Sequence, residues 1–430
     1  MKALMTVLRT QWDKLAKIFS NGLTARVTQH DFGHGIKDFF SLLCLLEIIG
    51  AMLLIFSASP WSMADACDRG CAYQTQARAS VQGTGGLEEY TPMMTKHARK
   101  AIGWAVGRPV DGYGTILHTE DGGQNWVRQG TPEEIPNVEL SGVSAIDARE
   151  AWVVGDLDEE SGYGVLLHTR DGGKTWCREG KSDDLGGIGL VAISAVDMYT
   201  AWAVGSNGVI LRTTNGGCRW ERQGVGQVPN VLLQGVYASD ASHVWVVGAN
   251  EEGNKYGTIL RSTDGGATWE KVPYTLTHTP TDFYLITVHG LNANEVWAVG
   301  HDQIVHISII SNGISVTDQT PAFSSMLDIN GIFALNRRTI WAVADASNIW
   351  RSDNGGKTWK VRNGGHHNLG YVLRVCAIDI LNAWATTELQ DRSGQVLYTS
   401  DGGKNWAAQQ IPVAPGMWGI SFVKEMGLTS

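Results

Sequence analysis

The sequence predicts an all-β protein, a seven-bladed β-propeller made of four-stranded blades. A phrase of the type Ala-Trp-Ala-Val-Gly recurs seven times at intervals of about 43 to 52 residues. A second phrase, most complete at Leu167–Trp176, follows six of the seven copies. After about residue 100, no segment keeps a helical period over three turns. A repeat of this length with four short strands is typical of a propeller blade. The first phrases centre on Trp104, Trp152, Trp202, Trp245, Trp297, Trp341 and Trp384.

Each repeat contains four predicted strands, and the second repeat shows them most clearly. Its first three strands are expected at residues 142–146, 151–155 and 165–169, and its fourth opens at Trp176. These runs are rich in β-branched and aromatic residues and are bounded by Gly, Asn and Asp, as strands usually are.

The turn between the third and fourth strands has a constant pattern of Asp or Asn, two glycines and a Trp. The Asp or Asn side chain can bond its own backbone two residues on, and Gly accepts the positive φ of a tight hairpin. The Trp can then fold between neighbouring sheets, where it buries about 150–250 Å². The pattern resembles the Asp-box, or BNR repeat, and we assign it a structural role. Its residues are Asp121, Trp126, Asp171, Trp176, Asn215, Trp220, Asp264, Trp269, Asn354, Trp359, Asp401 and Trp406.

The fifth repeat lacks this box, and the first repeat lacks a convincing first strand. The fifth box has degenerated to Ser308–Gly313, but Trp297 shows that a blade is present. The chain ends with Trp418–Val423, which matches a first strand that no second strand follows. We therefore predict that this C-terminal strand completes the first blade and closes the ring, which removes open sheet edges.

The N-terminal hundred residues predict export. We divide the chain into a cytoplasmic leader (1–38), a hydrophobic signal or membrane-anchor helix (39–58), an export-site and linker region (59–99) and the propeller (100–430). Lys and Arg precede the apolar run, which places the N-terminus in the cytoplasm. Ala64-Asp65-Ala66 suits a signal peptidase, so a cleaved signal and an uncleaved anchor both remain open. The propeller is expected in the periplasm or on the extracytoplasmic face of the inner membrane.

Composition excludes several partners and cofactors. From Cys67 onward the chain has 28 Lys and Arg against 38 Asp and Glu, a net charge of −10. This charge argues against nucleic acid and against anionic lipid as partners. The six cysteines do not form a disulfide scaffold, although Cys67 and Cys71 could pair after export. We expect no metal site, His366-His367 included, and no cofactor.

No catalytic residues stand out. A sialidase needs an arginine cluster, a Tyr nucleophile and an Arg-Ile-Pro phrase, and the nearest phrase here is Arg108-Pro109. The other arginines lie largely on predicted third or fourth strands, at Arg178, Arg212, Arg222, Arg261 and Arg351. We therefore predict that the protein is not an enzyme, with a sialidase-like, carbohydrate-active glycosidase as the alternative.

Function is expected where the repeats differ from one another. The loops between strands two and three are long in four repeats, at residues 108–114, 156–164, 249–257 and 388–395, and three of these loops are acidic. The acidic residues of these loops either are simply exposed to solvent without a function, or form the edge of a partner-binding surface, or bind Ca²⁺ weakly. Apolar residues on the adjacent linkers either start the next strand or form an interface. The candidate partner-binding residues are Asp156, Asp158, Glu159, Glu160, Glu251, Glu252, Tyr274, Phe283, Tyr284, Phe323, Glu388 and Asp391.

The two phrases together, Trp-Ala-Val-Gly and Ile-Leu-His-Thr-x-Asp-Gly-Gly-x-x-Trp, are similar to those of the photosystem II assembly and stability factor family over roughly residues 100 to 425. The resemblance implies an exported, non-catalytic scaffold that docks on an integral membrane-protein complex. In non-photosynthetic bacteria it implies an accessory of an RND/MMPL-type transporter or a similar complex. If the source is photosynthetic, it implies a photosystem II client. A ligand-binding or sorting-type propeller with a site in its channel also stays open.

Overall fold

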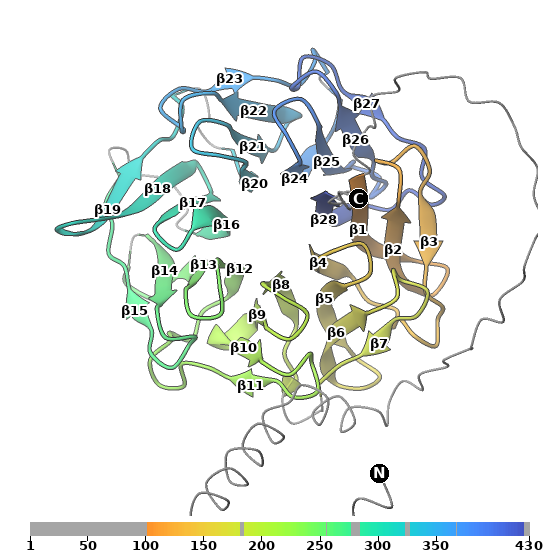
Figure 1. Cartoon of the computed structure of the whole chain (residues 1–430), viewed down its shortest axis with the longest axis horizontal. Helices are drawn as coiled ribbons and strands as arrows, with labels where there is room; N and C mark the ends of the chain where they lie inside the picture. The colour runs from red at the N-terminus through yellow and green to blue at the C-terminus, as the bar shows by residue number, and fades with distance from the viewer. Residues whose placement is uncertain are drawn as a thin grey trace, which may run out of the picture. The chain divides into compact units, whose positions relative to one another are not determined.

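The computed structural model describes residues 101–180, 185–254, 256–276, 284–322, 327–366 and 368–424. They form seven antiparallel four-stranded sheets arranged around a central axis (Figure 1). The predicted all-β, seven-bladed propeller is thus confirmed. The predicted leader, hydrophobic helix and linker lie outside the described residues. Within the described ranges, no helix is long and apolar enough to cross a membrane.

We number the blades along the chain and give the strands of each blade from the axis outward. Blade 1 contains β28 (Met417–Lys424), β1 (Ala101–Val110), β2 (Tyr113–Thr119) and β3 (Val127–Gln129). Blade 2 contains β4 (Leu140–Ala145), β5 (Ala151–Asp158), β6 (Tyr163–Thr169) and β7 (Cys177–Arg178). Blade 3 contains β8 (Leu190–Ala195), β9 (Ala201–Gly205), β10 (Ile210–Thr213) and β11 (Glu221–Arg222), with a 3-10 turn η1 (Ser206–Gly208) after β9.

The remaining four blades follow the same order. Blade 4 contains β12 (Leu233–Ala238), β13 (Val244–Asn250), β14 (Gly257–Ser262) and β15 (Glu270–Lys271). Blade 5 contains β16 (Leu285–Asn292), β17 (Glu295–Gly300), β18 (Gln303–Ile310) and β19 (Gly313–Asp318). Blade 6 contains β20 (Ile329–Ala334), β21 (Ile340–Ala344), β22 (Asn348–Ser352) and β23 (Lys360–Val361). Blade 7 contains β24 (Tyr371–Ala377), β25 (Ala383–Glu388), β26 (Val396–Thr399) and β27 (Ala407–Ala408).

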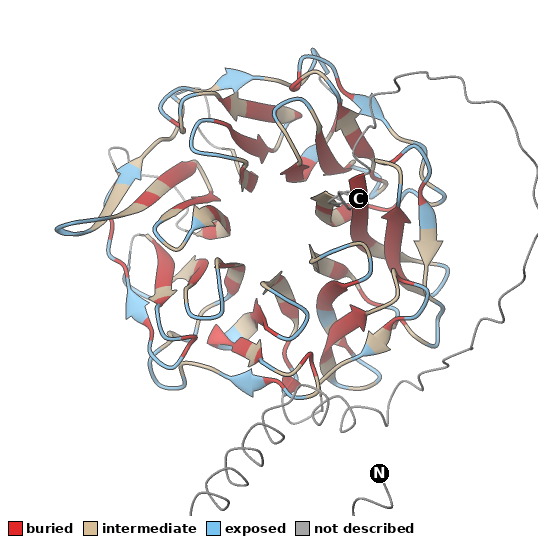
Figure 2. Ribbon diagram, viewed as in Figure 1, coloured by how far each residue is buried: buried red, intermediate tan, exposed pale blue. Residues whose placement is uncertain are grey.

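The core lies between the sheets, where the second strand of each blade is buried on both of its faces (Figure 2). The Trp of each repeated phrase is at most 1% exposed. A buried aromatic side chain of this size contributes about 4–6 kcal/mol of gross hydrophobic free energy. The Trp phrase is therefore the framework of the ring, and the short outermost strands remain exposed.

The box turns satisfy their own polar groups. In blade 1, Thr119 Oγ1 donates to Asp121 Oδ1 at 2.8 Å and accepts a hydrogen bond from the Gly123 amide at 2.8 Å. Asp121 Oδ1 also accepts the Asn125 amide at 2.9 Å. In blade 7, hydrogen bonds from the backbone and then the side chain of Asn405 lower the pKa of Asp401 to about 2. The box carboxylates thus stabilise the turns that they begin.

Side-chain hydrogen bonds join four pairs of neighbouring innermost strands among the described residues. Ser144 Oγ accepts the Ala195 amide at 3.1 Å, and Ser194 Oγ accepts the Ala238 amide at 3.0 Å. Ser421 Oγ accepts the amide of Ala145 in the same way, at 3.1 Å. In blade 5 the equivalent residue is His289, whose Nδ1 accepts the Ala334 amide at 3.1 Å. Burial lowers the pKa of His289 to about 4, so the ring nitrogen stays unprotonated and able to accept.

The predicted closure by the C-terminal strand is also confirmed. β28 pairs with β1 in an antiparallel register that runs from Ala101 opposite Lys424 to Gly107 opposite Met417. Phe422 of this strand stacks on Trp384 of blade 7, with ring centroids 3.9 Å apart and an interplanar angle of 15°. The last strand therefore joins the first and last blades through both its backbone and its core side chains.

The cysteines differ from expectation. Cys177 and Cys218 are both disulfide-bonded, although we expected no disulfide scaffold. Cys376 is free and buried in β24. Cys67 and Cys71, for which we considered a mutual disulfide, lie outside the described residues.

Candidate functional site: the loop face

The antiparallel strands give the propeller two different faces. The turns between strands two and three lie beside the linkers from strand four to the next blade, and we call this side the loop face. The Gly208 amide, for example, donates to the Val231 carbonyl at 2.7 Å, and the Gly394 amide donates to that of Ala414 at 2.9 Å. The turns between strands one and two lie beside the box turns on the opposite side, which we call the Asp-box face.

Two of the expected long loops are extended hairpins instead. β1 continues to Val110 and turns back at Asp111-Gly112, where both residues have positive φ. β5 continues to Asp158 and returns at Tyr163. An arginine from the outermost strand supports each hairpin. Arg128 lies 3.7 Å from the centroid of the Tyr113 ring.

Asp158 and Glu388 do not belong to an exposed acidic rim, which corrects our expectation. Asp158 is 8% exposed and accepts a hydrogen bond from Arg178 Nη1 at 2.8 Å. Its pKa is lowered, because the hydrogen bonds from Ser161 and Arg178 outweigh the effect of burial. Glu388 is also 8% exposed and is paired with Arg108. Both carboxylates stabilise the loop face from within.

The other acidic candidates remain closer to solvent. Glu251 forms an ion pair with Lys271. Asp391 accepts hydrogen bonds from the backbone and hydroxyl of Ser393, which lower its pKa. The exposed members of the set are Asp156, Glu159, Glu160, Glu252 and Asp391.

Two of the four aromatic candidates are packed against polar partners. Tyr274 is 9% exposed, and its hydroxyl donates to Gln303 Oε1 at 3.1 Å, so it packs as the start of a blade rather than as an interface. Tyr284 is half-buried, and its hydroxyl donates to Asp328 Oδ1 at 2.7 Å. The same oxygen lies 2.7 Å from His301 Nδ1. Phe283 and Phe323 lie outside the described residues.

The most highly connected charged group of this face joins blades 1, 2 and 7. Arg108 Nε donates to Glu388 Oε1, and Arg108 Nη1 donates to Glu139 Oε2, each at 2.7 Å. The guanidinium lies 5.4 Å from the ring centroid of Trp418. The pKa of Glu139 is raised, chiefly by burial, while Arg108 opposes the shift and Glu388 and Asp156 add to it. We call Arg108, Glu139 and Glu388 the closure triad, because it joins the two ends of the ring.

A cleft of about 530 Å³ opens beside the closure triad. The blade 1 hairpin forms one side with Arg108, Pro109 and Val110, and the loop and linker of blade 7 form the other. The Arg392 side chain is exposed at this rim, and the Arg392 backbone holds a positive φ of 65°. The cleft offers cations, an exposed carboxylate and proline-flanked apolar surface, which suit an extended polypeptide.

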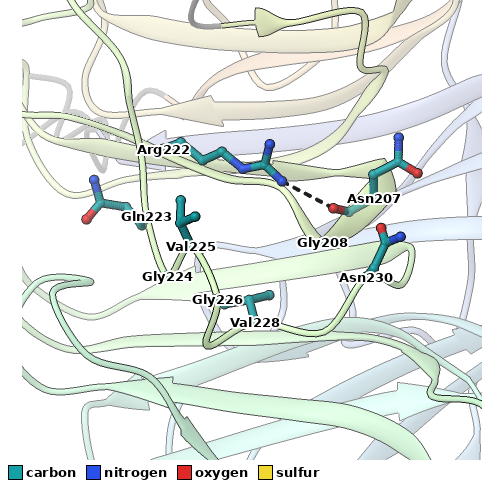
Figure 3. Close-up of a pocket in the computed structure, with 9 residues that line it drawn as sticks. All are labelled: Asn207, Gly208, Arg222, Gln223, Gly224, Val225, Gly226, Val228 and Asn230. Atoms are coloured by element: carbon teal, nitrogen blue, oxygen red, sulfur yellow. Dashed lines mark hydrogen bonds between the residues drawn. The ribbon is translucent and has the colours of Figure 1, made fainter.

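A second depression of about 530 Å³ lies on blade 3 (Figure 3). Arg222 Nη2 donates to the Asn207 carbonyl at 3.4 Å across it. The 224–230 linker forms the opposite wall, where Val225 is 74% exposed. This surface is polar and open, and carries no carboxylate.

Sequence reasoning missed Arg374, which lies on an innermost strand. Its Nη1 donates to the carbonyl oxygens of Asn330 and Leu373, at 2.7 and 2.8 Å. Burial lowers its pKa to about 10. Arg374 pairs with Thr386, two residues after the Trp of the second strand. The residues at the same position on the innermost strands of the other blades are all small: Gly142, Ala192, Gly235, Thr287, Gly331 and Gly419. Aligning the repeats would have revealed it.

The repeats of the ring match a known family. The model of a family described as photosynthesis system II assembly factor YCF48 matches residues 88–233 and 227–361. The chain belongs to this family. None of the curated proteins matches the sequence.

The chain is also similar to solved propeller structures. A structure described as "YCF48 bound to D1 peptide" is 18% identical, covers 69% of this chain and 93% of its own, and has a TM-score of 0.50. YCF48 from Cyanidioschyzon merolae is 18% identical over 71% of this chain and 94% of its own, with a TM-score of 0.47. A putative 6-phosphogluconolactonase from Bacteroides uniformis is 12% identical, covers 76% and 99%, and has a TM-score of 0.51.

In this member of the YCF48 family, three of the arginines on the third and fourth strands have structural partners. Arg212 Nη1 donates to the Gly265 carbonyl at 2.7 Å, and Arg351 Nε donates to Asp353 Oδ1 at 2.8 Å. Arg178 is paired with Asp158. His366 Nε2 lies 3.1 Å from the Trp406 carbonyl, and the described residues contain no cluster of three metal-ligating side chains.

Proposed function

We propose that this protein is a non-catalytic scaffold that binds a protein partner through its loop face. Membership of the YCF48 family carries the proposal. A family relative has been solved with a D1 peptide bound, which supports a polypeptide as the ligand. The closure triad and the cleft beside it offer a rigid, preformed surface, which lowers the ordering cost of binding.

The site of action that we propose is outside the cytoplasm, on an integral membrane-protein complex. The disulfide-bonded Cys177 and Cys218 support an oxidising compartment, since structural disulfides are rare in the cytosol. The apolar run at residues 39–58 supports contact with a membrane. An RND/MMPL-type transporter is the partner class that we favour, and photosystem II takes its place in a photosynthetic source.

Site-specific crosslinking tests the proposal. A photoreactive amino acid is placed at Glu159 or Asp391 on the loop face, and at Thr175 or Asn405 on the Asp-box face as matched exposed controls. After crosslinking in cells, the tagged chain is purified from solubilised membranes. We expect an adduct with a membrane protein from the two loop-face positions and none from the controls.

Charge reversal then locates the binding surface. Asp391→Lys lies at the rim of the cleft, and Glu252→Lys lies away from it on blade 4. We expect Asp391→Lys to weaken recovery of the partner more strongly than Glu252→Lys. A chain that elutes alone, or that crosslinks to protein only from the Asp-box face, would show that the proposal is wrong.

A further inference from the structure

Exposed apolar side chains gather at two turn tips of the Asp-box face. Between the first and second strands of blade 3, Met198 and Tyr199 are 43% and 45% exposed. Between the corresponding strands of blade 7, Ile380 and Leu381 are 53% and 50% exposed. The equivalent tips of blades 4 and 5 carry Ala241-Ser242 and Ala293-Asn294. The fold therefore does not require large apolar residues at this position.

The two apolar tips are held rigidly. Asp379 Oδ1 accepts the amides of Leu381 and Asn382 at 2.9 and 2.8 Å. Asp197 Oδ1 accepts the amides of Tyr199 and Thr200 at 2.8 and 2.7 Å. Each tip also braces the adjacent box, because the Leu381 carbonyl accepts the Gly402 amide at 3.0 Å and the Tyr199 carbonyl accepts the Gly216 amide at 2.9 Å. The exposed side chains thus project from fixed turns.

Basic residues occupy the tip of the blade that precedes each apolar tip. Arg337 and Arg338 lie at the turn of blade 6, where the Arg338 carbonyl accepts the Gly355 amide at 2.9 Å. Arg149 holds the same place in blade 2, where its carbonyl accepts the Gly172 amide at 2.9 Å. The box turns add further exposed cations. These exposed residues are Arg149, Lys174 and Arg219 around the first apolar tip, and Arg337, Arg338, Lys357 and Lys404 around the second.

Arginine side chains connect each basic blade to its apolar neighbour. Arg351 of blade 6 donates through Nη1 to the Ile380 carbonyl at 2.6 Å. Arg170 of blade 2 donates to the Gly216 carbonyl beside Tyr199. The same basic-then-apolar order therefore occurs twice, on blades that lie across the ring from each other (Figure 1). Two such contacts on one face suit a flat surface rather than a groove.

Both ends of the described ring leave from this face. The Ala101 carbonyl accepts the Gly122 amide of the blade 1 box at 2.9 Å. Lys424 Nζ donates to the Ile378 carbonyl at 3.1 Å, directly beside the apolar tip of blade 7. The described ring therefore both begins and ends on the Asp-box face.

We infer that the Asp-box face is a membrane-contact surface that rests on a bilayer carrying anionic headgroups, with the two apolar tips inserted between the headgroups. The net charge of −10 argued against anionic lipid, and the Asp-box face itself carries Asp197, Asp379 and the box carboxylates, so the inference rests on the local clusters of Arg and Lys beside the two apolar tips. Each basic residue near an anionic surface strengthens binding to it by about fivefold in affinity, and aliphatic and aromatic side chains partition into the interface. The loop face then points away from the bilayer, free for a protein partner.

Vesicle flotation tests this inference with the chain from Ala66 onward, which removes the apolar run. This part forms a compact unit, and its ring closes through its own ends. Vesicles of phosphatidylcholine alone are compared with vesicles that also contain phosphatidylglycerol. We expect binding to the anionic vesicles, which high salt weakens, and little binding to phosphatidylcholine. Absence of binding to the anionic vesicles would overturn the inference.

Surface variants separate this face from the other. Ile380→Ser/Leu381→Ser is expected to weaken binding by about tenfold. Arg337→Gln/Arg338→Gln is expected to weaken it by about 25-fold, because each lost cation lowers the affinity by about fivefold. Val225→Ser and Arg222→Gln remove an exposed apolar group and an exposed cation from the loop face, and should leave binding unchanged. Circular dichroism and thermal melting check that each variant is folded. Equal losses in the loop-face variants would contradict the assignment.

A final measurement distinguishes lipid from protein on this surface. A photoreactive amino acid at Leu381 in the full chain should yield lipid adducts in membranes, whereas a protein adduct would identify a protein interface and overturn the inference. The result is independent of the proposed scaffold function, which depends on crosslinks from Glu159 and Asp391. The membrane-contact inference can therefore be wrong while the scaffold function is right, and the reverse also holds.

Discussion

Arg108 and Glu388 are separated by 280 residues in the sequence, yet Arg108 Nε donates to Glu388 Oε1 at 2.7 Å. The bond joins β1 of blade 1 to β25 of blade 7. The pKa of Arg108 is raised, with the hydrogen bond to Glu388 as the largest cause. The ring is thus closed by a charged contact on the loop face as well as by the pairing of β28 with β1.

Arg108→Gln should destabilise the propeller, because it leaves Glu139 and the largely buried Glu388 without their cation. Breaking a fully buried ion pair costs more than this, but the Arg108 side chain is partly exposed to solvent. We therefore expect the free energy of unfolding, measured in urea, to fall by about 2 kcal/mol. Arg219→Gln removes a pair whose side chains are 71% and 59% exposed, and should cost well under about 1 kcal/mol. Equal losses in the two variants would show that the closure triad contributes no more to stability than an exposed surface ion pair.

The packing of Gly103 against Phe422 predicts a coupled pair of mutations. A Cβ on Gly103 would lie 2.5 Å from the Phe422 ring, so Gly103→Ala should lower stability by about 1–3 kcal/mol. Phe422→Leu alone leaves space beside Trp384. The double variant should lose less stability than the sum of the two single losses in urea unfolding. Strict additivity would mean that the two sites do not touch in solution.

His289 should make stability depend on pH. Its pKa is about 4 in the folded state against an ordinary 6.5, so the unfolded chain binds the proton first. Stability should therefore fall as the pH drops from 6.5 towards 4, by about 3 kcal/mol in total. His289→Ser introduces the residue that accepts the same bond in blades 2 and 3, and should remove this part of the pH dependence. Ser194→Ala loses a similar bond without a titratable group, and should keep the pH profile of the parent protein.

Cys376 should report global unfolding. Burial raises the pKa of its thiol to about 12, so iodoacetamide should not modify it in the native protein. Modification should appear in urea at the same midpoint as the change in Trp fluorescence. Cys177 and Cys218 should stay unmodified until a reductant is added. Labelling of Cys376 without denaturant would indicate local opening of β24.

The blade count and the closure could be predicted because they rest on local, repeated signals. The Trp of the second strand is buried in every blade, and Trp418–Val423 is a first strand with no second. The exposure of individual acids could not be predicted in this way. Asp158 is covered because Arg178 faces it from two strands away, and Glu388 is covered because Arg108 reaches it from the neighbouring blade 1.

Other features needed knowledge of which blades are neighbours. The disulfides of Cys177 and Cys218 have no signature in their spacing. The contiguity of Arg337-Arg338 with Ile380-Leu381 exists only once blades 6 and 7 stand side by side. The extended hairpin of blade 1, by contrast, could have been predicted from Asp111-Gly112, because this dipeptide is a strong signal for a hairpin turn. We had interpreted the segment as a long loop.

The pairing of β28 with β1 also fixes when the ring can form. Blade 1 is completed by β28, the last of the described strands along the chain, so until β28 has been made β1 presents an unpaired edge and the core around Trp384 is incomplete. Such an edge can pair with another chain until Met417–Lys424 arrives. A chain that stops before Met417 should therefore behave as an aggregation-prone intermediate rather than as a slightly shorter propeller.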